Sequence, residues 1–173
     1  LTGASVEEVT GRGGGLTDAA FLKKKHVIEH ALSLHAPDKN DPIDVLSKVG
    51  GFDLCAMTGV FLGAAIEHVP VVVDGFISIV AALCASRLAS HAKAYFIGSH
   101  RSFEIGYRLA EQELGLHPCL ELGMRLGEGS GCPIAFRVVE AACAVMCTMA
   151  TFPEAAIDDE YLTDIRAKDS FTV

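Results

Sequence analysis

Hydrophobic positions change their period several times along the chain, and each change marks a predicted element. Between residues 69 and 148, short β-branched runs that suit buried strands alternate with longer apolar stretches of helical spacing. Strands are predicted over 69–74, 94–99 and 119–124, and helices over 19–35, 43–49, 53–67, 76–90, 102–114 and 131–148. The alternation predicts an α/β domain in which helices flank a mainly parallel sheet, in a Rossmann-like arrangement.

Composition divides the chain into two parts. Residues 1–150 carry the alternating elements and are expected to form one α/β unit, whereas residues 151–173 are more polar. We expect this tail to add a helical segment to a small domain. Within the first part, Asp18 is the expected cap of the first long helix. The apolar face of that helix is expected to comprise Phe21, Leu22, Val27, Ile28 and Leu32.

Charge and cysteine content narrow the class of protein. The net charge of −8 makes nucleic acid an unfavourable partner, and the most apolar window, 75–89, is too short to span a membrane. The polar N-terminus has no basic region of the kind that begins a signal peptide. The six cysteines form no CxxC pair and lie mostly in apolar surroundings, which predicts reduced, buried thiols in a cytoplasmic protein.

Polar residues at the predicted strand ends are candidates for a site, because parallel α/β sheets bind ligands beyond the carboxyl ends of their strands. Asp74 ends the first strand, where an acid is costly unless it is paired or functional; it could also cap the following helix. Ser99 and Ser102 flank His100 and Arg101 at the end of the second strand. Either serine could donate to a phosphate or cap a helix.

Two glycine-rich turns precede helices. In GRGGG, residues 11–15, backbone N–H groups can converge on an anion at a helix N-terminus, with Lys24 on the first turns of the helix. The turn matches neither a Walker loop nor a dinucleotide fingerprint, so a plain flexible turn is the alternative.

The second turn, LGEGSG, places Glu128 between two glycines, with Ser130 as the expected N-cap. The helix N-terminus favours the carboxylate anion and apolar burial opposes it, a combination that suits a general base. A helix-capping role without catalysis is the alternative. No metal site is predicted, because His26 and His30 lack a third ligand.

Five segments together resemble the nicotinate-nucleotide–dimethylbenzimidazole phosphoribosyltransferases of cobalamin biosynthesis. They are VTGRGGGL (9–16), GGFDLCAMTGVFLGAA (50–65), PVVVDGF (70–76), IGSHRS (97–102) and LGMRLGEGSGCPIAFRVVEAACAVM (122–146). The resemblance extends over about residues 2 to 158. The most specific part is RLGEGSG followed by an apolar helix with EAAC.

The resemblance implies transfer of a phosphoribosyl group from nicotinate mononucleotide to dimethylbenzimidazole, without a cofactor. Glu128 then corresponds to the general base, and Leu126 to a residue that touches the benzimidazole. The residues that correspond to nucleotide- and phosphate-binding positions are Gly13, Gly14, Gly15, Lys24, Asp74, Gly75 and Ser102.

Two departures from the family pattern change what is expected. The family loop usually reads GRGTG, and Gly14 replaces its threonine hydroxyl. Family members also carry a further N-terminal half with its own glutamate and benzimidazole-pocket residues. We therefore expect a homodimer or a complementing N-terminal half as the partner. The alternative is a non-catalytic nucleotide- or base-binding module of the same fold.

Overall fold

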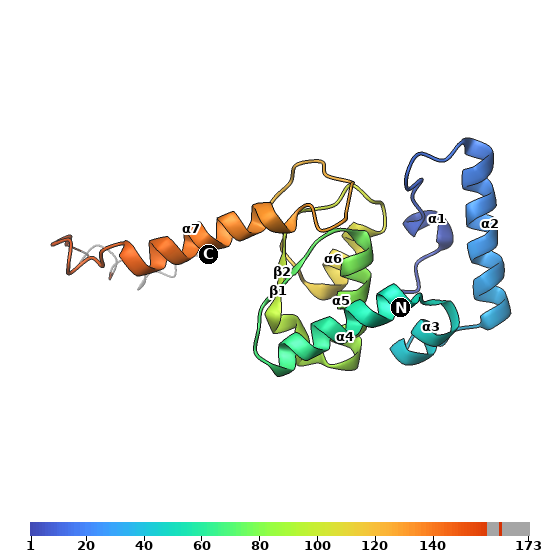
Figure 1. Ribbon diagram of the computed structural model, residues 1–173, viewed down its shortest axis with the longest axis horizontal. Helices are drawn as coiled ribbons and strands as arrows, with labels where there is room; N and C mark the ends of the chain where they lie inside the picture. The colour runs from blue at the N-terminus through green and yellow to red at the C-terminus, as the bar shows by residue number, and fades with distance from the viewer. Residues whose placement is uncertain (159–162, 164–173) are drawn as a thin grey trace. The chain divides into compact units, whose positions relative to one another are not determined.

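The computed structural model describes residues 1–158 and 163 (Figure 1). Its helices are α1 (Val6–Val9), α2 (Asp18–His35), α3 (Pro42–Val49), α4 (Phe52–Ile66), α5 (Phe76–Leu88), the 3-10 helix η1 (Ser90–Tyr95), α6 (Tyr107–Leu114) and α7 (Cys132–Thr148). Its strands are β1 (Val71–Val73) and β2 (Phe96–Gly98). The chain forms two compact units, 1–136 and 137–173, so the predicted division at residue 150 stays a prediction.

The α/β architecture with a small parallel sheet is confirmed. β1 and β2 pair in parallel, with Val71 opposite Phe96 and Val73 opposite Gly98. Each strand has three residues, fewer than predicted. The second is shorter because η1 takes up its predicted start. Val73 is buried but Val71 is only half-buried, so β1 is not buried along its full length.

The predicted third strand over 119–124 is wrong. An isolated parallel bridge joins His100 to Leu120, and beyond it the N–H of Phe103 donates to the carbonyl of Met124 at 2.9 Å. The three residue steps from His100 to Phe103 are therefore matched by four from Leu120 to Met124. Gly123, just before Met124, has a left-handed φ of 64°. Such a backbone cannot continue a regular ladder, so the segment follows the end of β2 as irregular chain.

Two predicted helix starts are also corrected. The N-cap of α2 is Thr17 rather than Asp18: the Thr17 hydroxyl accepts from the N–H of Ala20 at 3.4 Å. The Asp18 carboxylate instead pairs with Arg12 at 2.6 Å. The helix predicted over 102–114 begins only at Tyr107, because the residues before it form a loop beyond the end of β2.

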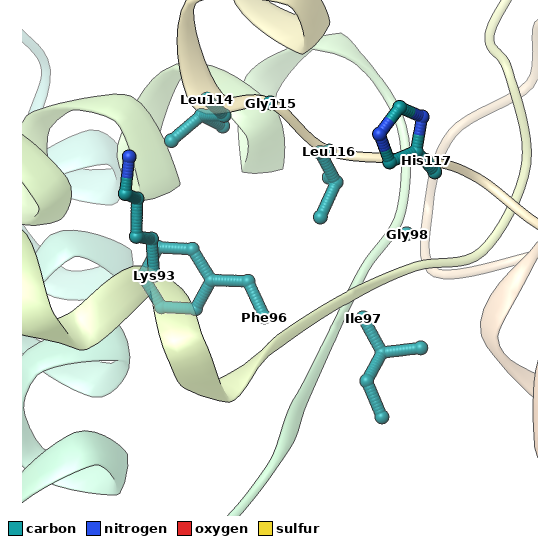
Figure 2. Close-up of a pocket in the computed structure, with 8 residues that line it drawn as sticks. All are labelled: Lys93, Phe96, Ile97, Gly98, Leu114, Gly115, Leu116 and His117. Carbon is teal, nitrogen blue, oxygen red and sulfur yellow. The ribbon is translucent and has the colours of Figure 1, made fainter. Parts of the chain in front are cut away.

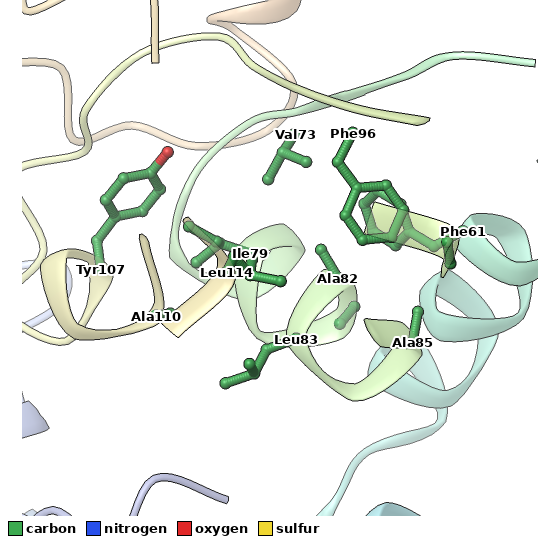
Figure 3. Close-up of a cluster of buried hydrophobic side chains, with 12 residues drawn as sticks. Phe61, Val73, Ile79, Ala82, Leu83, Ala85, Phe96, Tyr107, Ala110 and Leu114 are labelled. Carbon is green, nitrogen blue, oxygen red and sulfur yellow. The ribbon is translucent and has the colours of Figure 1, made fainter. Parts of the chain in front are cut away.

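The core of the first unit is built around α5, which packs against α4, β1 and α6 (Figure 3). Fully buried alanines such as Ala82 and Ala85 let neighbouring backbones approach closely. Phe61 of α4 meets Phe96 of β2 edge to face, with ring centroids 5.0 Å apart. Burying a side chain of this size contributes about 1.5–3 kcal/mol, so the core fixes the strands from which the candidate site extends.

Several apolar side chains remain exposed within the described residues. The expected apolar face of α2 is only partly covered: Leu22 is 66% and Val27 57% exposed, whereas Phe21 and Ile28 are half-buried. Phe52 at the start of α4 is 96% exposed. No helix in the described part is long and apolar enough to cross a lipid bilayer.

The prediction of buried thiols is mostly wrong. Cys84 is buried and Cys132 is half-buried, whereas the other four cysteines are exposed. Burial raises the pKa of the Cys84 thiol. Burial, followed by the nearby negative charge of Asp74, raises the pKa of the Cys132 thiol. A raised pKa makes both of these thiols less ready to form thiolates.

Candidate active site

The ends of β1 and β2 bring the first two predicted site segments together. Asp74 and Gly75 follow β1, and Ser99 follows β2. The N–H and hydroxyl of Ser99 donate to the carbonyl of Val73 at 2.9 and 2.8 Å, so the two ends are joined directly. Asp74 is only 6% exposed and Ser102 only 5%. Parallel pairing therefore places the buried acid Asp74 beside the buried segment that carries the hydroxyls of Ser99 and Ser102.

Asp74 binds the third predicted site segment. Its Oδ2 accepts the N–H of Gly129 at 3.0 Å, and its Oδ1 accepts the N–H of Gly131 at 2.8 Å. The helix after Asp74, α5, begins with Gly75 as its N-cap and has no side-chain cap, so the capping alternative for Asp74 is wrong. The acid instead holds residues 127–131, here called the Glu128 loop, which precede α7.

The expected cap of α7, Ser130, does not act as one. Its buried hydroxyl has no hydrogen-bond partner among the described residues. The carbonyl of Gly131 accepts the N–H of Ala135 at 3.1 Å, so Gly131 is the N-cap residue and α7 begins at Cys132. Asp74, at the end of β1, instead accepts the N–H groups on either side of Ser130, just before the helix.

The Glu128 loop has a left-handed backbone over three consecutive residues. The φ angles of Gly127, Glu128 and Gly129 are 74°, 56° and 74°. Glycine adopts this region freely, whereas another L-residue pays roughly 1–2 kcal/mol. Such strain persists where surrounding contacts enforce it, and it is typical of functional sites. The loop presents the carboxylate of Glu128 on the exposed surface of this chain.

Buried Ser99 and His100 pack against Gly131 of the Glu128 loop. His100 is fully buried; its Nδ1 lies 3.1 Å from the hydroxyl of Ser99 and 3.6 Å from Oδ1 of Asp74. Its Nε2 has no partner among the described residues. A Cβ on Gly131 would collide with Nδ1 of His100 and lie 2.9 Å from Oδ1 of Asp74. Gly131 is therefore a point of close approach between loop and pair.

The first glycine loop is built differently. Gly13, Gly14 and Gly15 are all exposed, and Gly13 and Gly15 have φ angles of 57° and 98°. The N–H of Gly15 donates to the carbonyl of Arg12 at 3.3 Å, so this amide is already used within the loop. The Lys24 ammonium, half-buried on α2, donates to the carbonyl of Gly11 at 2.8 Å. The Lys24 side chain thus reaches from α2 back to the glycine loop.

Contacts connect this loop to the strand-end residues. Ser102 accepts the N–H of Glu104 at 3.3 Å with its hydroxyl, and the Glu104 carboxylate lies directly against Gly11. On the other side, a Cβ on Gly75 would lie 3.5 Å from the Cα of Gly127 in the Glu128 loop. Gly75 therefore neighbours the Glu128 loop, and Ser102 neighbours the glycine loop through Glu104.

Arg101, charged and beside the site, is committed to ion pairs. Its guanidinium meets the buried carboxylate of Glu111 at 2.7 Å and that of Glu121 at 3.1 Å. The hydrogen bonds and charge of Glu111, and then the charge of Glu121, raise the pKa of Arg101 further above its usual range. Removing one partner of such a pair leaves a buried charge uncompensated. Arg101 therefore ties the strand-end loop to α6.

The remaining site residue, Leu126, is 74% exposed. Two cavities of the first unit are lined by residues outside the predicted site. One of about 300 Å³ lies beside β2, between Phe96 and His117 (Figure 2). The other, of about 550 Å³, lies along α2. Among the described residues, no group of three potential ligands could hold a metal ion.

Comparison with known proteins identifies the class first. A sequence model of a family described as phosphoribosyltransferase matches residues 1–157. More narrowly, the chain belongs to the nicotinate-nucleotide–dimethylbenzimidazole phosphoribosyltransferase family.

The relatives are longer than this chain. The Clostridium perfringens protein (strain ATCC 13124) named as that enzyme is 54% identical over 173 residues, which are 100% of this chain and 48% of the relative. The Clostridium tetani protein (strain Massachusetts / E88) with the same name is 48% identical over 94% of this chain and 45% of its own length. The chain thus spans about half the length of these relatives, in their C-terminal half.

A solved structure gives the same result for the fold. The crystal structure of CobT from Thermus thermophilus is 34% identical and superposes with a TM-score of 0.84. The match covers 91% of this chain and 46% of that one.

Proposed function

We propose that this chain supplies half of an active site that transfers the phosphoribosyl group of nicotinate mononucleotide to 5,6-dimethylbenzimidazole. The products are α-ribazole 5′-phosphate and nicotinate, for assembly of the cobalamin nucleotide loop. The names of the relatives support this reaction. The single observation that carries it is Glu128, a strained glutamate between two left-handed glycines, on a loop anchored to the strand ends.

Glu128 acts in this proposal as the general base. Its carboxylate takes the proton from the N–H nitrogen of the benzimidazole, and the other ring nitrogen attacks the anomeric carbon of the ribose. The bond from that carbon to nicotinate breaks with inversion. Its electron pair stays on the pyridine nitrogen, which departs neutral. A positioned base of this kind contributes ~10²–10⁴ in rate. Leu126 is proposed to pack on the benzimidazole.

Nucleotide binding is assigned to the other predicted residues. Lys24 and the backbone of Gly13, Gly14 and Gly15 are proposed to meet the phosphate, together with Ser102. Lys24 already lies 2.8 Å from the loop carbonyl of Gly11, within reach of an anion bound there. The proposed reaction needs no metal or cofactor, because the pyridine nitrogen of the leaving group departs uncharged and Lys24 offsets part of the phosphate charge.

A second polypeptide half completes the proposed site. Glu128 and Leu126 are exposed in this chain, and its apolar surface on α2 and α4 is open. An N-terminal half, on the same or another chain, would cover this surface and close the base pocket. Homodimerisation and a cytoplasmic location are proposed as well.

The same exposure favours a second candidate function. With Glu128 and Leu126 open to water, the chain by itself fits a module that binds a nucleotide or a base without turnover. In that case ligands would raise its melting temperature, since binding to the native state stabilises it.

The experiment combines this chain with the N-terminal half of the Clostridium perfringens relative. Nicotinate mononucleotide and dimethylbenzimidazole are supplied, and release of nicotinate and α-ribazole 5′-phosphate is followed by chromatography. The proposed function predicts product with both polypeptides present. Binding without product in the combined sample supports the module, and neither binding nor product refutes both.

A further inference from the structure

The contacts of Asp74 are unusual for a nucleotide-binding acid. Both of its carboxylate oxygens face backbone N–H groups of the Glu128 loop, 55 and 57 residues away in sequence, at 3.0 and 2.8 Å. Hydrogen bonds between backbone N–H groups and a carboxylate are charge-assisted and about twice as strong as neutral ones. The two that Asp74 accepts bracket Ser130, one from Gly129 and the other from Gly131, directly after Glu128.

These two hydrogen bonds to Asp74 hold a backbone conformation that would otherwise relax. Glu128 holds a φ of 56°, which a non-glycine residue leaves when nothing enforces it. The N–H groups on either side of Ser130 are fixed by Asp74, and the N–H of Ser130 itself donates to the carbonyl of Gly127 at 2.9 Å. The loop is thus closed on itself and anchored to the end of β1.

We propose that Asp74 is a positioning residue: its carboxylate fixes the backbone of the Glu128 loop and thereby aims the Glu128 side chain. This role rests on the proposed function, in which Glu128 is the base. Asp74 touches no reacting atom. Ser99 and His100 pack against the segment that Asp74 holds. Only glycine fits at position 131, because a Cβ there would collide with His100 and crowd Ser99 and Asp74. Misplacing a catalytic group by about 1 Å can cost about 10²-fold in rate.

The test is Asp74→Asn, in this chain combined with the N-terminal half of the Clostridium perfringens relative. Asparagine keeps the shape but turns one acceptor into a donor, so one of the two loop bonds must be lost. We expect kcat to fall about 10²-fold while the Kd for nicotinate mononucleotide stays within about 3-fold. In a Glu128→Gln background, Asp74→Asn should lower kcat no further, because both changes remove the same step.

Asp41→Asn is the matched control. Asp41 caps α3 with one oxygen, Oδ1, which accepts from Ile43 at 2.9 Å and Asp44 at 3.2 Å. Asparagine keeps that oxygen, so this variant should retain the wild-type kcat. Gly131→Ala is a second test variant, which disturbs the same bracket from the loop side and should reproduce the kcat loss of Asp74→Asn.

A weakened Kd with unchanged kcat would overturn the proposal and place Asp74 on the nucleotide. So would equal losses from Asp74→Asn in the wild-type and Glu128→Gln backgrounds. If the wild-type assembly makes no product, the proposed function fails. The positioning claim is then judged by hydrogen exchange in this chain. Asp74→Asn should speed exchange at the Gly129 and Gly131 amides and leave the α5 amides unchanged; unaltered protection of those two glycines refutes it.

Discussion

The glycine loop at 11–15 and the Glu128 loop at 127–131 both precede helices, but different kinds of contact hold them. The first is closed on itself by the bond from Gly15 to Arg12 at 3.3 Å, and the long side chains of Lys24 and Glu104 touch its half-buried first residue, Gly11; the rest of it is exposed. The second is held by the buried Asp74. A locally held loop can adapt to a ligand, whereas a loop fixed by a buried carboxylate can aim one side chain. This difference agrees with the proposed roles, nucleotide binding for the first loop and proton transfer for the second.

Glu128→Gln should separate these two roles with the largest effect. The amide has nearly the shape of the carboxylate but cannot accept the benzimidazole proton. Turnover in the complemented assembly should fall by ~10²–10⁴, while affinity for nicotinate mononucleotide stays close to wild type. Steady-state kinetics and calorimetry measure the two quantities. Unchanged turnover would remove Glu128 as the base.

Lys24→Ala should produce the opposite result. A hydrogen bond to a charged group is worth about 1.5–3 kcal/mol, so the Kd for nicotinate mononucleotide should rise about 10- to 100-fold. At saturating nucleotide, kcat should change little. The neighbouring Lys23 is exposed on the same helix, and Lys23→Ala is the control that should leave the Kd unaltered. Equal effects of the two variants would argue against a phosphate contact at Lys24.

Thiol reactivity should report the burial around the Glu128 loop. The pKa of Cys132 is raised by burial and by Asp74, so less thiolate is present at neutral pH and alkylation should be slow. Exposed Cys143 and Cys147 should react several-fold faster with iodoacetamide, as peptide mass spectrometry can follow. Alkylation of Cys132 at the same rate as these two would contradict a buried, acid-supported loop.

The smallest effect concerns stability. Glu128→Gly relieves a left-handed cost of about 1–2 kcal/mol and adds about 0.5–1 kcal/mol of backbone entropy loss, so the free energy of unfolding should rise by about 0.5 kcal/mol. Arg125→Gly, in the same segment but outside the left-handed region, should lower it. Urea unfolding measures both. A stability loss from Glu128→Gly would mean that the loop is unstrained.

The sequence predicts most helices and the α/β class, because apolar periodicity is a local signal. It also predicts which residues follow each strand, since strand ends carry polar residues where the apolar runs stop. The segment over 119–124 is the exception, because its alternation is that of a strand but its glycine backbone is left-handed. Irregular pairing of this kind depends on the partner segment rather than on local propensity.

The connections within the site could not be predicted. Asp74 and the Glu128 loop are separated by more than fifty residues, and nothing local indicates that Asp74 caps that loop instead of α5. The sequence indicates His100 only as a polar residue at a strand end, yet it is fully buried beneath the loop. In the sequence, only Gly131, the second glycine of GSG, could have indicated that the loop approaches Asp74 and His100 closely.

The most direct test of the central claim is a crystal structure of the complemented assembly with dimethylbenzimidazole bound. The account predicts that the Glu128 carboxylate lies about 2.6–3.2 Å from a ring nitrogen of the base, with both Asp74 bonds to the loop intact. A base bound elsewhere, with the Glu128 carboxylate still facing solvent, would contradict it.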